Sequence, residues 1–472
     1  MRPGAARPHR LVTIHRIRSI PMANTLTGAR PLSWPHRIRR FVDVGSTFLA
    51  IYWSYKRIQR NKKLAPAERE RRISAAHRSS AKRIYRLATR MEGLLIKTCQ
   101  FISSRADVAP PEYVAVLSRL QDRVPARPFR DVAALIEREL GAHPDAIFDD
   151  FSRRPIASAS LAQVHRARTK DGRDVAVKVQ YPGIDRVMET DLRNIAILVR
   201  ILARIEPNFD FRVIMAELNK DVPGELDFVR EGHSSERVAR DLAHRADIRI
   251  PAVVWEHTAR RVLTTEFIEA TKISEIPKLI EQGIDPNQVA LIMTEAYCEQ
   301  ILVHGFFHAD PHPGNLFVLP GPVVVFLDFG LSKELPEGFR LNYARLVMAL
   351  VGQDEDQMVQ AFRALGFKTK SEDPQSLVAL GQSFFESTGA DQKPYIDADV
   401  MPEVNERLAR ILNANPVTEI PGDILLIFRV LGLMSGLQKR LDSHVNVVET
   451  ITPYAEAQAA RLAELAGGSA AG

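Results

Sequence analysis

Three short polar motifs, widely separated along the chain, constrain its fold more than any other feature. A lysine, Lys178, closes a Val-Ala-Val-Lys segment; His-Ala-Asp-Pro-His-Pro-Gly-Asn occupies 308–315; and Leu-Asp-Phe-Gly contains Asp328. Each motif follows or interrupts an apolar run that is typical of a buried strand. We therefore expect a fold that brings one strand and two loops together at a single site.

Around Lys178 the pattern predicts a hairpin. Residues 161–180 contain an Asp171-Gly172 turn, and valines alternate with other residues in the second half of the segment. This is the pattern of two antiparallel strands joined by a tight turn. A further strand is expected over 260–268.

Helical periodicity dominates the rest of the chain. It covers 66–141, with an interruption at Pro110-Pro111, returns over 184–245, and prevails beyond Ser274 apart from strands within 316–328. A small strand-bearing lobe followed by a large helical lobe predicts an α+β, bilobal fold. The expected divisions are a basic, disordered or targeting segment (1–40), an amphipathic helix (41–64), a helical segment (65–148), a strand-bearing lobe with inserted helices (149–270), a helical lobe (271–460) and a disordered tail (461–472).

The net charge of +7 is unevenly distributed. Residues 1–63 carry +13, so the remaining chain is negative. This excludes a basic folded body, and we expect no nucleic-acid partner. Two cysteines among 472 residues cannot form a disulfide framework, which favours a reducing compartment.

Two interpretations of the basic end remain open. Residues 1–40 are rich in arginine and contain no acid, as is typical of a mitochondrial transit peptide, whereas Met22 would be the true start of a bacterial protein. The apolar run 44–55 is shorter than the ~20 residues that span a bilayer, and no transmembrane helix is expected. With Tyr52, Trp53 and Tyr55 before a basic cluster, it suits a helix lying on an anionic membrane surface. The alternative is a helix that covers the protein body.

The chemistry of the three motifs points to phosphoryl transfer. Lys178 suits a point charge on nucleotide phosphates. Asp310 and Asn315 have the separation of a kinase catalytic loop, in which Asp310 orients the acceptor and Asn315 binds magnesium. Asp328 is the second expected Mg²⁺ ligand, since Mg²⁺ takes one or two carboxylates and keeps several waters. In place of a glycine-rich loop stand the small residues that we expect near the phosphates: Ala157, Ser158, Ala159 and Ser160.

A regulatory element of many protein kinases is missing. The position before the catalytic Asp310 is Ala309, where an arginine would pair with a phosphorylated activation loop. No Ala-Pro-Glu follows Asp328, and Ser332 is the only nearby hydroxyl before Tyr343. The sequence therefore disfavours a conventional Ser/Thr protein kinase.

A carboxylate must brace Lys178, and Glu-Leu-Asp-Phe-Val-Arg-Glu offers Glu225, Asp227 and Glu231. On an earlier helix, Lys97 and Gln100 share one face. By itself this pair is typical of a solvated surface.

The chain closely resembles the UbiB family of atypical, protein-kinase-like proteins, which are associated with ubiquinone biosynthesis. Six segments carry the resemblance: "LLIKTCQF", "PIASASLAQV", "VAVKVQ", "ELDFVRE", "HADPHPGN" and "LDFG". The resemblance implies a protein-kinase-like fold with an added N-terminal helical segment over the nucleotide cleft. It implies that Lys97 and Gln100 face Glu225 and Asp227, and that Glu231 braces Lys178. The family's Lys-x-Gly-Gln has Cys99 in place of glycine here, either as a small buried hydrophobe or as a bulkier group that loosens the contact.

The resemblance leads to a functional expectation: an ATP (or ADP) and Mg²⁺ dependent atypical kinase or ATPase at a membrane surface, supporting an isoprenoid quinone lipid. The alternatives are a nucleotide-binding scaffold that organises quinone-biosynthesis enzymes and a conventional Ser/Thr kinase. Expected partners are a membrane surface and an isoprenoid lipid or quinone precursor, with quinone-biosynthesis enzymes and a second copy of the chain as further candidates. The expected location is the cytoplasmic face of a bacterial membrane, or the mitochondrial matrix and inner membrane if the basic end is a transit peptide.

Overall fold

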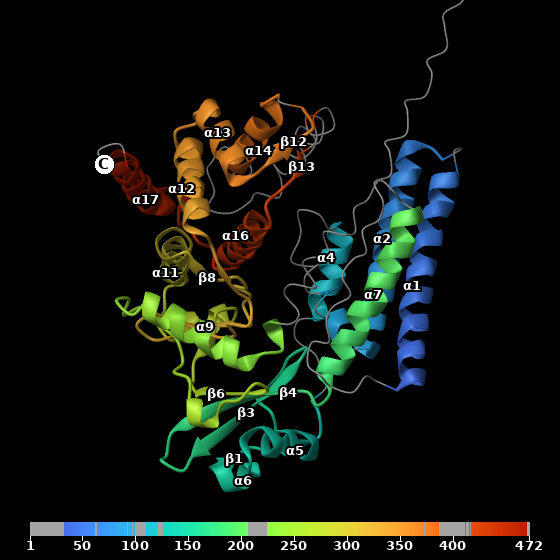
Figure 1. Cartoon of the computed structure of the whole chain (residues 1–472), viewed down its shortest axis with the longest axis vertical. Coiled ribbons are helices and arrows are strands. Elements are labelled where there is room, and N and C mark those ends of the chain that lie inside the picture. Colours follow the sequence, from blue (N-terminus) through green and yellow to red (C-terminus); the bar gives the residue numbers. More distant parts are fainter. Residues whose placement is uncertain are drawn as a thin grey trace, which may run out of the picture.

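The computed structural model describes residues 33–61, 64–91, 93–96, 98–99, 110–120, 126–205, 224–371, 373–386, 411, 415 and 417–469. Figure 1 shows a strand-bearing lobe, a mainly helical lobe, and a layer of long helices to one side of them. Within the ranges just given, no helix combines the length and the apolar character needed to cross a membrane.

The first lobe is built on an antiparallel sheet with the strand order β1-β3-β4-β6, in which β2 also pairs with β3. Its strands are β1 (Phe148–Phe151), β2 (Ala157–Ser158), β3 (Ala162–Thr169), β4 (Asp174–Gln180) and β6 (Val262–Glu266). The expected hairpin is confirmed: β3 and β4 meet at Gly172, whose φ of +88° favours glycine.

Alternation along β4 sets its two faces. Val175, Val177 and Val179 are fully buried and pack with helix α5 (Phe129–Leu140), which ends at Gly141 as expected. The short helix α6 (Pro144–Ile147) follows it. Because side chains alternate along a strand, Lys178 points to the opposite face, toward helix α9 (Phe228–Asp241).

The second lobe contains a four-stranded sheet in the order β5-β10-β9-β7 and a two-stranded sheet of β8 and β11. These strands are β5 (Ile248–Arg249), β7 (Thr271–Lys272), β8 (Phe306–His308), β9 (Leu316–Leu319), β10 (Val323–Phe326) and β11 (Ser332–Glu334). β5 comes from the stretch that the sequence assigned to the first lobe, yet it pairs with β10.

Helices surround these strands and enclose the largest hydrophobic core, which includes Phe307, Phe326 and Phe362. They are α10 (Ile276–Glu281), α11 (Pro286–Cys298), the π-helix η3 (Glu299–His304), α12 (Glu337–Val351), α13 (Glu355–Leu365), α14 (Gln375–Glu386), α16 (Gly422–Arg440) and α17 (Val447–Ser469). Smaller elements are the 3-10 helix η2 (Trp255–His257) and the pair β12 (Lys368–Thr369) and β13 (Val417–Glu419).

The layer at the side consists of α1 (Trp34–Arg60), α2 (Pro66–Met91) and α7 (Ile184–Ile205), which run side by side (Figure 1). Helix α4 (Pro111–Leu117) and the 3-10 helix η1 (Ser118–Leu120) lie against α2. A second hydrophobic core joins this layer to the first lobe, because it contains Leu94, Ile96 and Cys99 together with Leu161 and Leu226.

Arg40 fixes α1 to this layer. Its guanidinium donates to both carboxylate oxygens of Asp191 on α7, at 2.7 and 2.6 Å, and to the carbonyl of Met91 at the end of α2, at 2.8 Å. The Asp191 side chain is 1% exposed. Burial raises the pKa of Asp191, and the guanidinium of Arg40 opposes that shift.

Two expected boundaries are wrong. Helix α1 starts at Trp34 and not at residue 41, because Pro35 suits a first turn and Arg40 is held by Asp191. The tail expected to be disordered from 461 continues α17 to Ser469, since alanine, leucine and glutamate favour a helix. Residues 1–32 lie outside the described part of the chain.

We predict that Arg40→Ala lowers the free energy of unfolding by about 3–5 kcal/mol, because the buried Asp191 carboxylate loses its partner. The neighbouring variant Arg39→Ala is the control. The Arg39 side chain is 78% exposed, and its Nε lies 4.0 Å from Oδ2 of Asp43, which is a weak ion pair. It should cost no more than about 1 kcal/mol. Equal losses for the two variants, measured by chemical denaturation, would contradict the structural role of Arg40.

Candidate active site

Lys178 is held at the centre of the first sheet. Its strand β4 is paired on both sides, with Val164 of β3 and Leu263 of β6 opposite Lys178. The ammonium lies 2.7 Å from Oε1 of Glu231 and 3.2 Å from Oδ1 of Asp328. The expected pairing of Lys178 with a carboxylate is therefore present, and Glu231 supplies it.

Glu231 is positioned by the start of α9. The Asp227 side chain caps this helix by accepting from the backbone N–H groups of Val229 and Arg230, which places Glu231 in the first turn. Glu231 is 4% exposed. Burial raises its pKa to about 7, although the Lys178 ammonium opposes the shift.

The charges of this cluster are strongly coupled. Burial alone would lower the pKa of Lys178, but the carboxylates of Asp328 and Glu231 outweigh it, so that the pKa is raised. Lys178 consequently stays cationic, and two carboxylates share one ammonium. The cluster would gain further stabilisation from a second cation near Asp328.

Asp328 adopts a backbone conformation that is unusual for a residue other than glycine, with φ of +60°. Its carboxylate accepts a hydrogen bond from the Gly330 N–H at 3.3 Å. A side chain at Gly330 would lie close to this carboxylate, since a Cβ there would be 3.3 Å from Asp328 Oδ1. The strained conformation aims Asp328 at Lys178, and such strain is concentrated at functional sites.

The loop after β8 carries Asp310 and Asn315. The Asn315 side-chain amide donates to the Asp310 carbonyl at 3.2 Å, and the Asn315 carbonyl accepts from the Leu327 N–H at 2.8 Å. These bonds connect the Asp310 loop to the segment that precedes Asp328. Ala309 is fully buried beside it.

Arg429 is a site residue that the sequence analysis missed. It lies on α16 and donates to Oδ1 of Asp310 at 2.8 Å, although 119 residues separate the two. Its side chain is 8% exposed. A signal was available, because Arg429 is the one charge within the apolar segment 424–434.

His308 connects the Asp310 loop to the segment that contains Asp328. Its Nε2 lies 2.9 Å from the Asp328 carbonyl, and its Nδ1 lies 2.9 Å from the hydroxyl of Tyr297. Because a carbonyl only accepts, Nε2 carries the hydrogen, and Nδ1 accepts from Tyr297. Burial lowers the pKa of His308, so the ring is neutral. Through these two bonds His308 holds the Asp310 loop and the Asp328 segment together.

A narrow cavity of about 50 Å³ lies among these groups. It is far smaller than the roughly 300–1,000 Å³ of a typical ligand pocket. Its lining residues come from the small-residue loop, β4, α9 and both polar loops: Ala159, Ser160, Leu161, Ala162, Lys178, Glu225, Phe228, Glu231, Asp310, Asp328, Gly330 and Leu331.

Four predicted site residues have other places. Ala157 and Ser158 form β2 and pair with β3, so only Ala159 and Ser160 of the small-residue loop line the cavity. Asp227 is a helix cap, and Asn315 lies beside the cavity, bonded to the Asp310 backbone. Fewer of the predicted site residues therefore line the cavity than the motifs suggested.

The predicted occluding pair, Lys97 and Gln100, lies outside the described residues. Cys99 between them is 2% exposed within the second hydrophobic core, and burial raises its thiol pKa to about 12. This agrees with the interpretation of Cys99 as a small buried hydrophobe.

No group of three or more His, Cys, Asp or Glu side chains in the described ranges is arranged to hold a metal ion. This does not argue against a Mg²⁺ site, which needs only one or two carboxylates and water. Asp328 and Asn315 have the oxygen donors that such a site uses.

A strand lysine braced by a helix glutamate, facing Asp310 and Asp328 from a second lobe, defines a protein-kinase-like class of structure. The family described as "ABC1 atypical kinase-like domain" matches residues 119–362. The chain belongs to this family, which is also called UbiB or AarF.

Relatives extend the match over most of the chain. "AarF domain-containing protein kinase 1" of Xenopus tropicalis is 33% identical over 415 residues, covering 85% of this chain and 78% of the relative. "Protein ACTIVITY OF BC1 COMPLEX KINASE 8, chloroplastic" of Arabidopsis thaliana is 32% identical, covering 78% of this chain and 52% of the relative. The solved complex of Rv3197 with erythromycin from Mycobacterium tuberculosis has a TM-score of 0.57 and 22% identity, covering 81% of this chain and 97% of that one. The predicted α+β, protein-kinase-like fold is confirmed.

We predict that His308 makes stability fall in acid. Its ordinary pKa is 6.5 and its folded pKa is lower. The unfolded chain therefore binds a proton that the folded chain does not, and the stability contributed above pH 6.5 is lost as pH falls through the folded value. The loss amounts to at most about 1.4 kcal/mol per pH unit. Melting curves at pH 7.5 to 5 should show a smaller decline for His308→Gln than for the unchanged protein, and parallel curves would contradict this.

Proposed function

We propose that this protein is an ATP- and Mg²⁺-dependent atypical kinase or ATPase. The observation that carries the proposal is the cluster of Lys178, Glu231 and Asp328, with Asp310 on the same cavity. Membership of a family whose relatives are named as kinases supports it.

Each residue has a role in this proposal. Lys178, braced by Glu231, would hold nucleotide phosphates. Asp328 and Asn315 would hold Mg²⁺, which neutralises developing charge on the transferred phosphoryl group. Asp310 would orient the attacking hydroxyl or water and accept its proton.

Arg429 acts as a positioning residue for Asp310. Its guanidinium donates to Oδ1 of Asp310 at 2.8 Å and so fixes one of the two carboxylate oxygens. In this chain a cation from α16 is thus next to the catalytic aspartate, while the preceding position is Ala309. The Arg429 guanidinium is held next to Asp310 by the packing of α16, so this contact does not depend on a phosphorylated activation loop.

The narrow cavity implies an opening step. ATP and Mg²⁺ would have to separate Lys178 from Asp328, which are in contact at 3.2 Å, and displace the loop at Ala159 and Ser160. A turn holds this loop, with a 2.8 Å bond from the Ala159 N–H to the Ala162 carbonyl. The Tyr181 hydroxyl also donates to the Ala159 carbonyl at 2.9 Å. Slow nucleotide entry follows from these restraints.

We predict that the purified protein hydrolyses or transfers phosphate from ATP only with Mg²⁺. Lys178→Ala and Asp328→Ala should each reduce the rate by at least about 100-fold, since they remove groups that stabilise the transition state. Lys170→Ala, in the exposed turn between β3 and β4, is the matched control and should retain the rate.

Equal rates for all these proteins would overturn the enzymatic proposal. The alternative, a nucleotide-binding scaffold, is favoured by the narrow cavity. It predicts that ATP raises the melting temperature of the unchanged protein, and not of Lys178→Ala, without measurable turnover.

We further propose that the protein acts at a membrane surface and supports an isoprenoid quinone lipid. The quinone role rests on the family to which the chain belongs. The membrane surface is supported by a stripe of exposed apolar side chains on one face of α1: Trp34, Ile38, Val42, Leu49 and Trp53, which are 40–72% exposed. Their spacing along the helix keeps them on a common face. Arg57 and Arg60 end the helix, which suits anionic headgroups.

Of the aromatic residues near the end of α1, Tyr55 has partners within the protein. Tyr55 turns inward, with its hydroxyl 2.7 Å from Nδ1 of His77 and 3.1 Å from the hydroxyl of Tyr113. We therefore leave Tyr55 out of the proposed membrane surface, and Trp53 is the exposed aromatic residue near the basic end of α1.

We predict that the protein floats with vesicles containing anionic lipid and that the double variant Leu49→Glu/Trp53→Glu reduces the bound fraction at least about tenfold, because it places charge on the apolar stripe. Ile280→Glu alters an equally exposed apolar residue on α10 and should have no effect. Identical flotation of the two variants would contradict a membrane-facing α1. Loss of binding without loss of ATP turnover separates this proposal from the enzymatic one.

A further inference from the structure

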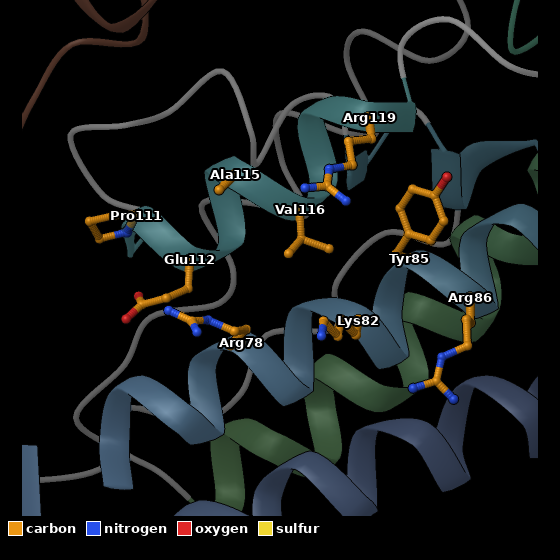
Figure 2. A pocket seen from close by; sticks show the side chains of 9 residues that line it. All are labelled: Arg78, Lys82, Tyr85, Arg86, Pro111, Glu112, Ala115, Val116 and Arg119. Carbon is orange, nitrogen blue, oxygen red and sulfur yellow. The ribbon is translucent and has the colours of Figure 1, made fainter. Parts of the chain in front are cut away.

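A groove of about 760 Å³ lies between α2 and α4, away from the nucleotide cavity (Figure 2). The two helices contact each other along their length, and η1 extends one wall. Helix α1 lies on the opposite side of α2 from α4 (Figure 1), so the groove is separate from the apolar stripe of α1. Its lining is Arg78, Lys82, Tyr85, Arg86, Pro111, Glu112, Ala115, Val116 and Arg119.

The lining is strongly basic. Arg78, Lys82 and Arg86 follow one another at intervals of four on α2, which places them on one helix face. Arg119 belongs to η1 and is directed toward α2 in Figure 2. In the part of the chain that the structure describes, no carboxylate lies within ion-pair distance of any of these four side chains.

One acid, Glu112, belongs to the lining and offsets part of this charge, since it interacts electrostatically with Arg78. Glu112 accepts a hydrogen bond from the Ser74 hydroxyl, which is the main reason why its pKa is lowered. It therefore remains a carboxylate, and the lining residues that the structure describes keep an excess of three positive charges. Such an excess in a groove concentrates anions.

Apart from Glu112, the described lining residues of the α4 wall are apolar. Pro111, Ala115 and Val116 face the groove from α4, and Tyr85 contributes a ring with a hydroxyl from α2. Basic side chains from α2 and η1, next to the apolar side chains of α4, match a molecule with an anionic end and a hydrocarbon body. Arg and Lys bind both carboxylate and phosphate, and the several oxygens of a phosphate let more than one of these cations bind it at once.

We propose that this groove binds a phosphorylated amphiphile, with the phosphate at Lys82 and Arg119 and the hydrocarbon along Ala115 and Val116. The phosphate comes either from a soluble alkyl or prenyl phosphate or from the headgroup of a bilayer lipid. The site is independent of the phosphoryl-transfer proposal, since none of its residues lines the nucleotide cavity.

The test uses the full chain and three probes: inorganic phosphate, dodecyl phosphate below its micelle-forming concentration, and phosphatidic-acid vesicles with phosphatidylcholine vesicles as reference. Dodecyl phosphate should bind at least about tenfold more tightly than inorganic phosphate, because its chain covers the apolar wall. Lys82→Gln and Arg119→Gln should each weaken binding about tenfold or more, and added salt should weaken it further.

Arg83→Gln is the matched control, because it removes the same charge one residue away on α2 and does not line the groove. It should bind as the unchanged protein does. Lys178→Ala should also retain binding, which separates the groove from the nucleotide cavity. Melting temperatures equal to that of Arg83→Gln show that the groove variants are folded.

The outcomes distinguish the two sources of phosphate. A soluble ligand is assigned if the unchanged protein binds dodecyl phosphate but not phosphatidic-acid vesicles, and if the groove variants lose the binding of dodecyl phosphate. Vesicle binding that is lost in the same variants assigns a lipid headgroup. The proposal is overturned if Lys82→Gln and Arg119→Gln bind every probe as Arg83→Gln does, or if no probe binds.

Discussion

The contact of one ammonium with two carboxylates organises the site. Lys178 belongs to the first sheet, Glu231 to α9, and Asp328 to the loop that follows β10 of the second sheet, so a single charge cluster connects three elements that are far apart in the sequence. Glu231 is almost fully buried, and a buried carboxylate without a partner would be strongly destabilising. The cluster therefore fixes the relative positions of these elements as well as the chemistry that they can perform.

A second buried ion pair holds two helices together outside the site. Arg40 and Asp191 join α1 to α7, and the core beneath them extends through Cys99 to Leu161, next to the nucleotide cavity. The helical layer is consequently packed against the small-residue loop through hydrophobic contacts. The exposed apolar stripe of α1 and the basic groove both belong to this layer, and they share no described residue. Any ligand bound there contacts elements that share a core with the cavity wall.

Much of the site was predictable because its residues lie in short motifs with fixed local geometry. The alternation of valines placed Lys178 on the face away from the core, and the Asp310 and Asp328 loops follow apolar strands. Glu231 was one of three candidate carboxylates, and the sequence did not decide among them without the family resemblance. Capping decides it in the structure: Asp227 is used to start α9, which leaves Glu231 one turn further along to meet Lys178.

The sequence by itself determined the hairpin, the main helices, the order of the two lobes and the polar groups of the cleft, because periodicity and turn residues act over short distances. Only the tertiary structure decided that Arg429 reaches Asp310, that Arg40 is buried against Asp191, and that the basic face of α2 closes a groove with α4. The partners in the two ion pairs are more than a hundred residues apart. No local pattern encodes such a pairing, because it depends on how helices pack after they have formed.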